Sequence, residues 1–249
     1  MKRSALILTL FLSALQMQAQ SDTLCNEHKF RLAHWALPIT LTAAGIWGQH
    51  NPVVTHMSNE IAEELQENID RKITVDDYLQ YSPTIAAFSL DLFGVPARHC
   101  FLPRLTMAAM AYTLMGLTVN SMKYTFHEWR PDHTARNSFP SGHTATAFVG
   151  AEILYQEYKH ISPWIGYMGY AAAAATGFFR MYNNRHYLHD VIVGAGIGML
   201  SAKAAYFLYP RLFGHPTYTL QTPSGHKVQV GGLPYFGNGE VGLVAAIRF

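Results

Sequence analysis

The sequence predicts an all-α fold, a membrane-embedded bundle of about six helices with a small C-terminal β-hairpin appendage. Hydrophobic residues make up 49% of the 249 residues and charged residues only 14%, against about 25% in a typical soluble domain. Moderately apolar segments of helical length follow one another through the middle of the chain. After Tyr209 the hydrophobic pattern changes to the alternation that is typical of strands.

The composition also excludes several classes of protein. The low charged fraction argues against a disordered chain, a coiled coil and a charge-rich nucleic-acid binder. The net charge of +2 gives no strong overall field that would recruit an acidic partner. Two cysteines, Cys25 and Cys100, cannot form a four-cysteine zinc site. They can form one disulfide or stay unpaired, and both alternatives stay open.

A signal peptide is predicted over residues 1–20. Lys2 and Arg3 precede an apolar run from Ala5 to Leu15, and Ala19 is a small residue at a suitable cleavage point. The run is shorter than the ~20 residues that a membrane-spanning helix needs. A retained first membrane helix is the alternative.

The helical domain is expected over residues 28–212. Most of its segments are at or below ~20 residues, so a soluble bundle with an unusually apolar core is the alternative to a membrane domain. The last two segments are the best spanning candidates, because the small residues of Ala171–Ala175 and Gly194–Gly198 let helices approach closely. The polar stretch 51–81 predicts an amphipathic surface helix without assigned chemistry. The apolar segments are 35–48, 83–95, 105–119, 144–155, 163–179 and 191–209.

A β appendage is expected over residues 213–249. Residues 217–222, 227–230 and 241–249 alternate or are rich in β-branched residues, and turn sequences separate them. Two or three strands are therefore expected, too few to close a membrane barrel.

Two polar motifs precede the fourth apolar segment. Lys123 and Arg130 are seven residues apart, two helical turns, so both cations project from nearly the same face. Pro131 predicts that this helix ends there. The sequence Pro140-Ser-Gly-His143 then opens an apolar helical run, so Ser141 suits the N-cap position and the helix N-terminus suits an anion.

A third motif combines Arg180, His186 and Asp190. The spacing of four residues between His186 and Asp190 lets the carboxylate hold the imidazole in one tautomer on a helix. Three cations, a helix N-terminus, two histidines and a carboxylate together suit a phosphoryl group that passes through five-coordinate phosphorus. A second Pro-Ser-Gly-His copy at 223–226 opens no helix and is interpreted as a hairpin turn.

In this order, the motifs Lys123-x6-Arg130-Pro131, Pro140-Ser-Gly-His143 and Arg180-x5-His186-x3-Asp190 resemble the type 2 phosphatidic acid phosphatase (PAP2) superfamily. That superfamily also holds the bacterial class A acid phosphatases and the vanadium haloperoxidases. The motifs cover residues 123–190, and the helical order resembles the family's six-helix core. The sequence departs from the family pattern at two points. Phe179 replaces the serine before Arg180, which puts one supporting hydrogen bond in question. The gap between Pro131 and Pro140 is only eight residues, shorter than is usual in the family, which implies a tight exposed loop with room for a large head group.

The resemblance implies a role for each motif residue. His186, oriented by Asp190, would attack phosphorus and form a phosphohistidine. His143 would protonate the leaving alkoxide and then activate water. No metal or other cofactor is expected, and His127, His133 and His189 are interpreted as neighbours within reach of substrate, not as metal ligands. The phosphate-binding residues would be Lys123, Arg130, Ser141, Gly142 and Arg180.

The resemblance thus implies a phosphoric monoester hydrolase that acts on a phosphorylated lipid in the membrane, with no nucleic-acid partner. The run from His186 into an apolar helix resembles the bacterial lipid phosphatase branch, and compact lipid A phosphatases in particular. Lipid A phosphate and undecaprenyl pyrophosphate are the expected substrates. A soluble periplasmic non-specific acid phosphatase is the main alternative, followed by a vanadate-dependent oxidase or a binding protein.

The inner membrane is the expected location, with the site facing the periplasm. This orientation assumes that residues 83–95 do not span, because they are 13 residues long and contain Asp91. If they span and the signal is cleaved, the site would face the cytoplasm. The oligomeric state is open.

Overall fold

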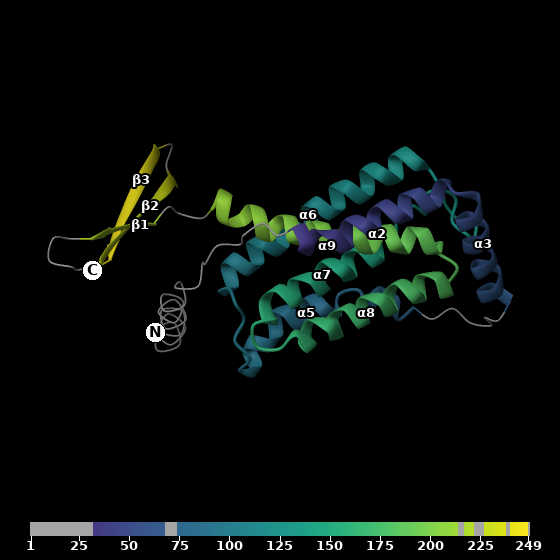
Figure 1. Cartoon of the computed structure of the whole chain (residues 1–249), viewed down its shortest axis with the longest axis horizontal. Coiled ribbons are helices and arrows are strands. Elements are labelled where there is room, and N and C mark those ends of the chain that lie inside the picture. Colours follow the sequence, from purple (N-terminus) through teal and green to yellow (C-terminus); the bar gives the residue numbers. More distant parts are fainter. Residues whose placement is uncertain (1–31, 68–73, 214–216, 222–226, 238–239, 249) are drawn as a thin grey trace, which may run out of the picture. The chain divides into compact units, whose positions relative to one another are not determined.

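The computed structural model describes residues 32–67, 74–213, 217–221, 227–237 and 240–248 (Figure 1). The predicted signal peptide and Cys25 lie outside these residues, so the predictions about them are not tested. The chain divides into a helical unit that ends at Ala205 and a C-terminal unit that begins at Tyr206, and each is described by itself.

The apolar segments predicted from the sequence all fall on helices. The polar stretch that follows the first of them forms α3 (Pro52–Glu67) and the short α4 (Asp76–Leu79). The remaining elements are α2 (Leu32–His50), α5 (Ser82–Ser89) with the 3-10 helix η2 (Leu90–Phe93), α6 (Phe101–Phe126), α7 (Gly142–Tyr158), α8 (Pro163–Tyr182) and α9 (Leu188–Leu212).

Helix α7 forms the core of the helical unit. It packs against α5, α6 and α8, and Figure 1 shows it running through the middle of these helices. Its apolar residues are buried on every side, which explains why the segment is apolar throughout instead of showing one apolar stripe. The completely buried residues of α7 include Ala145, Ala147, Val149, Ala151 and Ile153.

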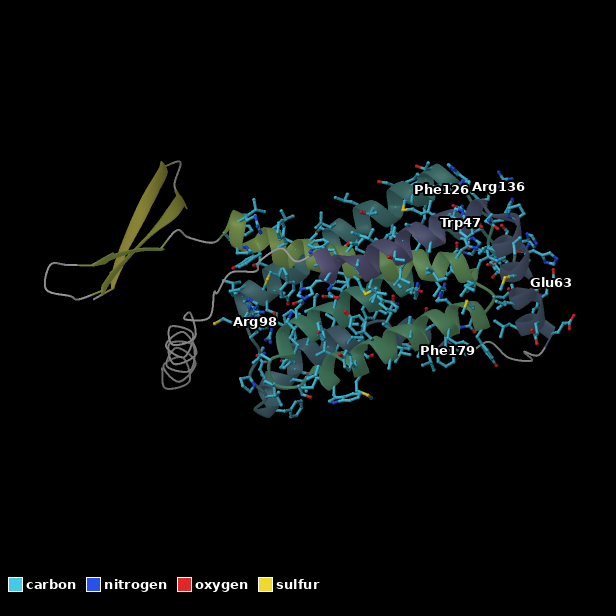
Figure 2. All side chains as sticks on the ribbon, in the orientation of Figure 1. Trp47, Glu63, Arg98, Phe126, Arg136 and Phe179 are labelled. Atoms are coloured by element: carbon cyan, nitrogen blue, oxygen red, sulfur yellow. The ribbon has the colours of Figure 1, made fainter. Side chains whose placement is uncertain are left out.

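The chain brings four helix termini together at one end of the unit, which we call the site end. These are the ends of α6 and α8 and the starts of α7 and α9. The backbone N–H of Ser141, just before α7, donates to the carbonyl of Asp190 in α9 at 3.1 Å. Trp47 and Phe126 also lie at this end, while Arg98 lies at the opposite, far end (Figure 2).

Residues 76–100 run back from the site end to the far end. Asp77 contacts His143 at the start of α7, and the N–H of Arg98 donates to the carbonyl of Glu157 at the end of α7. This segment therefore covers the length of α7, about 25 Å at 1.5 Å per residue. Residues 83–95 alone were predicted to be too short to cross a membrane. The whole segment is longer because α4 precedes this range and residues 96–100 follow it.

In the C-terminal unit, three strands pair as an antiparallel sheet in the order β1-β2-β3. Thr217 lies opposite Gly231, and Gln229 lies opposite Arg248. The second Pro-Ser-Gly-His copy lies between β1 and β2, outside the described residues. That this sheet is a separate appendage stays a prediction. The strands are β1 (Thr217–Gln221), β2 (Lys227–Gly237) and β3 (Glu240–Arg248).

Among the described residues, α9 is the one helix whose length and composition suit a membrane crossing. It was one of the two best candidates in the sequence. The other, now α8, is 20 residues long but does not reach the same apolar character.

Candidate active site

His186 and Asp190 form a buried pair at the site end. His186 lies in the turn between α8 and α9, and Asp190 lies in the first turn of α9. Their side chains are 2% and 0% exposed, and Nδ1 of His186 is 3.5 Å from Oδ2 of Asp190. The carboxylate thereby engages Nδ1 and leaves Nε2 as the nitrogen for attack.

Two further donors hold the same carboxylate oxygen. The hydroxyl of Ser138 donates to Oδ2 of Asp190 at 2.5 Å, and the backbone N–H of Tyr187 donates to it at 2.9 Å. Ser138 is buried and also lies 3.5 Å from Nδ1 of His186. Hydrogen bonds to an ionised carboxylate are stronger than neutral ones, so this oxygen is tightly fixed.

The surroundings of His186 keep its imidazole neutral at pH 7. Burial lowers the pKa of His186 to about 4, Asp190 opposes this shift, and the charges of Arg180 and Lys123 add to it. A neutral imidazole has a lone pair on Nε2, which a nucleophile needs.

Three cations surround this pair. Lys123, near the end of α6, donates to the carbonyl oxygen of Asn137. Nε of Arg130 donates to Oδ1 of the same Asn137 at 2.9 Å. The pKa of Arg130 is lowered by burial and by the nearby charges of Arg180 and Arg185. Cations held this close repel one another, and an anion placed between them would relieve the repulsion.

One nitrogen of the Arg180 guanidinium is held by an ion pair, while another has no hydrogen-bond partner among the described residues. Its Nη1 donates to Oδ2 of Asp76 at 2.6 Å, and Asn183 donates to the other oxygen of Asp76 at 2.9 Å. Nε of Arg180 is buried without a hydrogen-bond partner among the described residues. A buried unpaired donor is costly, so this atom is suited to an anionic ligand.

The start of α7 supplies backbone donors. Ser141 occupies the N-cap position, as expected, but its hydroxyl caps no backbone N–H and instead lies 2.9 Å from the hydroxyl of Thr144. Gly142 is the first residue of the helix, where N–H groups have no partner within the helix. This helix N-terminus faces the same end of the unit as the cations.

His143 lies at the more open side of the site. Its side chain is 33% exposed, and its Nε2 is 3.0 Å from Oδ1 of Asp77 in α4. Oδ1 of Asp77 is also 3.7 Å from Nη1 of Arg180. The two histidines therefore occupy different environments, one buried and one in contact with solvent.

The comparisons with known proteins agree with this arrangement. Residues 104–214, which contain all three motifs, match the family model described as PAP2 superfamily. Over this segment the chain is similar to the PAP2 superfamily.

Two curated relatives are similar to part of this chain. The lipid A 1-phosphatase of Porphyromonas gingivalis is 41% identical over 144 residues, which cover 57% of this chain and 32% of that protein. The bacitracin transport permease protein BcrC of Bacillus licheniformis is 33% identical over 81 residues, which cover 32% of this chain and 38% of that protein. The chain thus spans about a third of the length of these relatives.

Two solved structures are also similar to this chain. One is the crystal structure of Aquifex aeolicus LpxE, with a TM-score of 0.45, 24% identity, and coverage of 61% of this chain and 94% of that one. The other is the crystal structure of the first transmembrane PAP2 type phosphatidylglycerolphosphate phosphatase from Bacillus subtilis. Its TM-score is 0.42 at 20% identity, with coverage of 73% and 96%.

Four residues of the site were not predicted from the sequence: Ser138, Asp76, Asp77 and Arg185. Arg185 donates to Asp132 at 3.0 Å and adds a further positive charge next to Arg130. Only Arg185 carried a local signal, since it lies inside the third motif. The contacts of the others join residues between 48 and 107 positions apart.

The flanking histidines differ from one another. His127 and His133 are exposed and have positive φ angles of 47° and 54°. His189 is buried, and its Nε2 is 2.9 Å from Oε1 of Glu128. His189 thus neighbours Asp190, at 3.5 Å from its Oδ1, and is held by Glu128, while its contact with a substrate stays a prediction.

Glu128, His189 and Asp190 could in principle hold a metal ion, because one ligand atom from each lies within 4.8 Å of the others. Their hydrogen bonds suit another interpretation. Nε2 of His189 lies between Glu128, at 2.9 Å, and Oδ1 of Asp190, at 3.5 Å. One imidazole N–H can thus hold Glu128 without a cation, while Oδ1 of Asp190 is buried without a hydrogen-bond partner among the described residues.

Proposed function

We propose that this chain is a membrane lipid phosphatase that hydrolyses a phosphomonoester through a phosphohistidine on His186. The observation that carries the proposal is the buried His186–Asp190 pair beside three cations. His186 is neutral, and its Nδ1 faces Asp190, so Nε2 can act as a nucleophile. The cations and the start of α7 provide the charge that stabilises a pentacoordinate phosphoryl group.

The proposed reaction has two in-line steps. In the first, Nε2 of His186 forms a bond to phosphorus while the bond to the lipid oxygen breaks, and His143 donates a proton to that oxygen. In the second, water attacks phosphorus, the P–N bond breaks and His143 accepts the water proton. Asp190 stabilises the positive charge that develops on the His186 ring. The phosphate oxygens would be bound by Lys123, Arg130, Arg180, Ser141 and the N–H of Gly142.

No metal takes part in the proposed steps, because each charge and each proton transfer has a side chain to serve it. A metal chelator should therefore leave the activity unchanged.

Exposed apolar side chains favour a membrane enzyme over a soluble acid phosphatase. Leu37 in α2, Leu117 in α6 and Met168 in α8 are between 62% and 71% exposed. A soluble protein rarely exposes large apolar side chains on several helices, whereas lipid would cover them. Trp47 at the site end and Trp164 at the start of α8 are also exposed, as in the aromatic belts of membrane proteins.

A lipid A phosphate is the first proposed substrate and undecaprenyl pyrophosphate the second. Support comes from the relative named lipid A 1-phosphatase, which is 41% identical over a region of 144 residues. The loop before α7 carries the exposed residues Trp129 and Arg136, which we propose contact the head group.

We propose that the enzyme lies in the inner membrane with its site facing the periplasm. Helix α2 ends at the site end, and residues 76–100 run back to the far end. If α2 and residues 76–100 both cross the membrane, a periplasmic site requires α2 to begin on the cytoplasmic side. A signal peptide cleaved after residue 20 would instead place the start of α2 in the periplasm, so the two predictions conflict. Arg98 and Lys159 at the far end favour a cytoplasmic location for that end.

Phosphate release tests the proposed function. Membranes that contain the wild type or His186→Ala are incubated with lipid A, undecaprenyl pyrophosphate, phosphatidate or an aryl phosphate, each with excess EDTA. We expect EDTA-resistant release from a lipid that the His186→Ala variant lacks. Activity on the aryl phosphate alone, in the soluble fraction, would support the acid phosphatase instead.

A further inference from the structure

The site contains a second histidine–aspartate pair, formed across 66 positions of the chain. Oδ1 of Asp77 in α4 lies 3.0 Å from Nε2 of His143 in α7. Neither residue type nor local spacing marks Asp77 in the sequence, because it lies in the polar stretch between the first two apolar segments.

Asp76, the residue before Asp77, fixes α4 in place. It is 1% exposed, accepts a hydrogen bond from Arg180 at 2.6 Å and accepts another from Asn183 at 2.9 Å. Because Asp76 is held by two donors at the end of α8, the neighbouring Asp77 is aimed at His143. Asp77 itself is 52% exposed, so its geometry depends on this anchor and not on packing.

The contact defines which nitrogen of His143 can reach a substrate. Nε2 faces Asp77, which leaves Nδ1 for proton transfer. Partial burial and the charge of Arg180 in α8 lower the pKa of His143, and the carboxylate of Asp77 at 3.0 Å opposes this shift by stabilising the protonated ring. The charged groups that face His143 are Asp76 and Asp77 from α4 and Arg180 from α8.

We propose that Asp77 is a positioning residue for the reaction, whose carboxylate holds Nε2 of His143 and keeps a proton on Nδ1. In the first step the Nδ1 proton moves to the lipid oxygen as the P–O bond breaks and the bond from His186 to phosphorus forms. In the second step Nδ1 takes a proton from the attacking water as the P–N bond breaks. Asp77 stays ionised throughout. The inference rests on the proposed function.

The two pairs then serve opposite purposes. The His186–Asp190 pair is buried, and the neutral ring is the nucleophile. The His143–Asp77 pair is partly exposed, and in the proposal its ring acts as the acid in the protonated form that Asp77 stabilises. A buried nucleophile and a more exposed acid thus divide the two roles between the two histidines.

Two leaving groups distinguish this role from a structural one. An aryl phosphate releases a phenolate that needs little help from an acid, whereas a lipid alkoxide needs a proton. In Asp77→Asn we expect kcat for the lipid phosphate to fall about 10- to 100-fold, with KM little changed and the alkaline limb of the pH–rate profile moved to lower pH. We expect kcat/KM for the aryl phosphate, which reports formation of the phosphohistidine and not its hydrolysis, to change less than about threefold.

Two further variants serve as controls. Glu63→Gln removes an exposed carboxylate from α3 and should match the wild type on both substrates. Asp77→Glu retains the carboxylate and should recover most of the lipid activity, and Asp77→Gln replaces Asp77→Asn if the latter does not accumulate as folded protein.

The outcomes separate the inference from the proposed function. Equal losses of kcat/KM on both substrates, or an unchanged pH profile in Asp77→Asn, would overturn the role of Asp77. If His143→Ala loses kcat/KM equally on the two substrates, His143 is not the acid and the proposed mechanism itself is wrong, whatever Asp77→Asn does.

Discussion

Ser138 shows how a single hydroxyl can complete the nucleophile. Three donors converge on one oxygen of Asp190: the hydroxyl of Ser138, the N–H of Tyr187 and the ring of His186. The sequence places Phe179 where the family has a serine, which put a supporting hydrogen bond in question. Ser138 supplies a hydroxyl from the loop before α7, so the carboxylate still has a hydroxyl donor.

Replacing Ser138 by alanine should lower kcat about 10-fold with little change in KM, since a hydrogen bond to a charged group contributes about 1.5–3 kcal/mol. The control is Ser58→Ala, because Ser58 is equally buried but lies beside His189, 3.4 Å from its Nδ1. Steady-state kinetics on a lipid phosphate measure both variants. A Ser138→Ala enzyme as fast as Ser58→Ala would contradict this role.

The imidazole of His186 should take up a proton only near pH 4. Burial favours the neutral ring and outweighs the attraction of Asp190, so the pKa lies below the ordinary histidine value of about 6.5. Nuclear magnetic resonance of ring-labelled histidine in micelles measures this directly, with His186→Asn to assign the signal. Titration of the assigned signal at about 6.5 would show that the ring is not held as described.

At the scale of elements, glycines fix the distance between α7 and α9. A Cβ on Gly194 would lie 2.5 Å from the carbonyl oxygen of Ser141, and one on Gly198 would lie 2.4 Å from that of Ala145. The backbones therefore touch where α9 carries Asp190 and α7 carries His143. Close packing of small residues thus sets the spacing between the two halves of the site.

Gly194→Ala should disturb this contact and lower both stability and activity. Forcing a methyl group against a backbone oxygen costs about 1–3 kcal/mol. Gly116→Ala in α6 is the matched control, because a Cβ there meets nothing within 4 Å, and it should be neutral or slightly stabilising. Thermal unfolding in detergent and kcat measure both. Indistinguishable melting temperatures and rates for the two variants would refute the packing argument.

The elements were predictable to different degrees for a physical reason. The helices and the three motifs depend on local periodicity and spacing, which a single sequence displays. The contacts of Asp76 with Arg180 and of Glu128 with His189 join residues 104 and 61 positions apart, and no local pattern encodes them. The prediction for residues 83–95 rested on their length and on Asp91, while their neighbours extend the segment along the whole of α7.

At the scale of the whole molecule, the orientation in the membrane decides which lipids can reach the site. Thr134 is exposed at the site end, and His160 is exposed at the far end, just after α7. A cysteine at each position reports which side of the membrane that end faces, in a background where Cys25 and Cys100 are replaced by serine.

A membrane-impermeant thiol reagent should label Thr134→Cys in spheroplasts and label His160→Cys only after lysis. This follows from a periplasmic site with both α2 and residues 76–100 crossing. The parent without cysteines is the control for background labelling. The reverse pattern would mean a cytoplasmic site and would agree with a cleaved signal peptide.

The most direct measurement is to trap the phosphohistidine. Enzyme in membranes is mixed with a ³²P-labelled lipid phosphate and EDTA, quenched within one turnover, and separated from lipid. We predict label on the wild-type chain that is stable to alkali and lost in acid, located on the peptide that contains His186 and absent in His186→Ala. Phosphate release without a labelled enzyme, at the same rate in His186→Ala, would contradict the proposed mechanism.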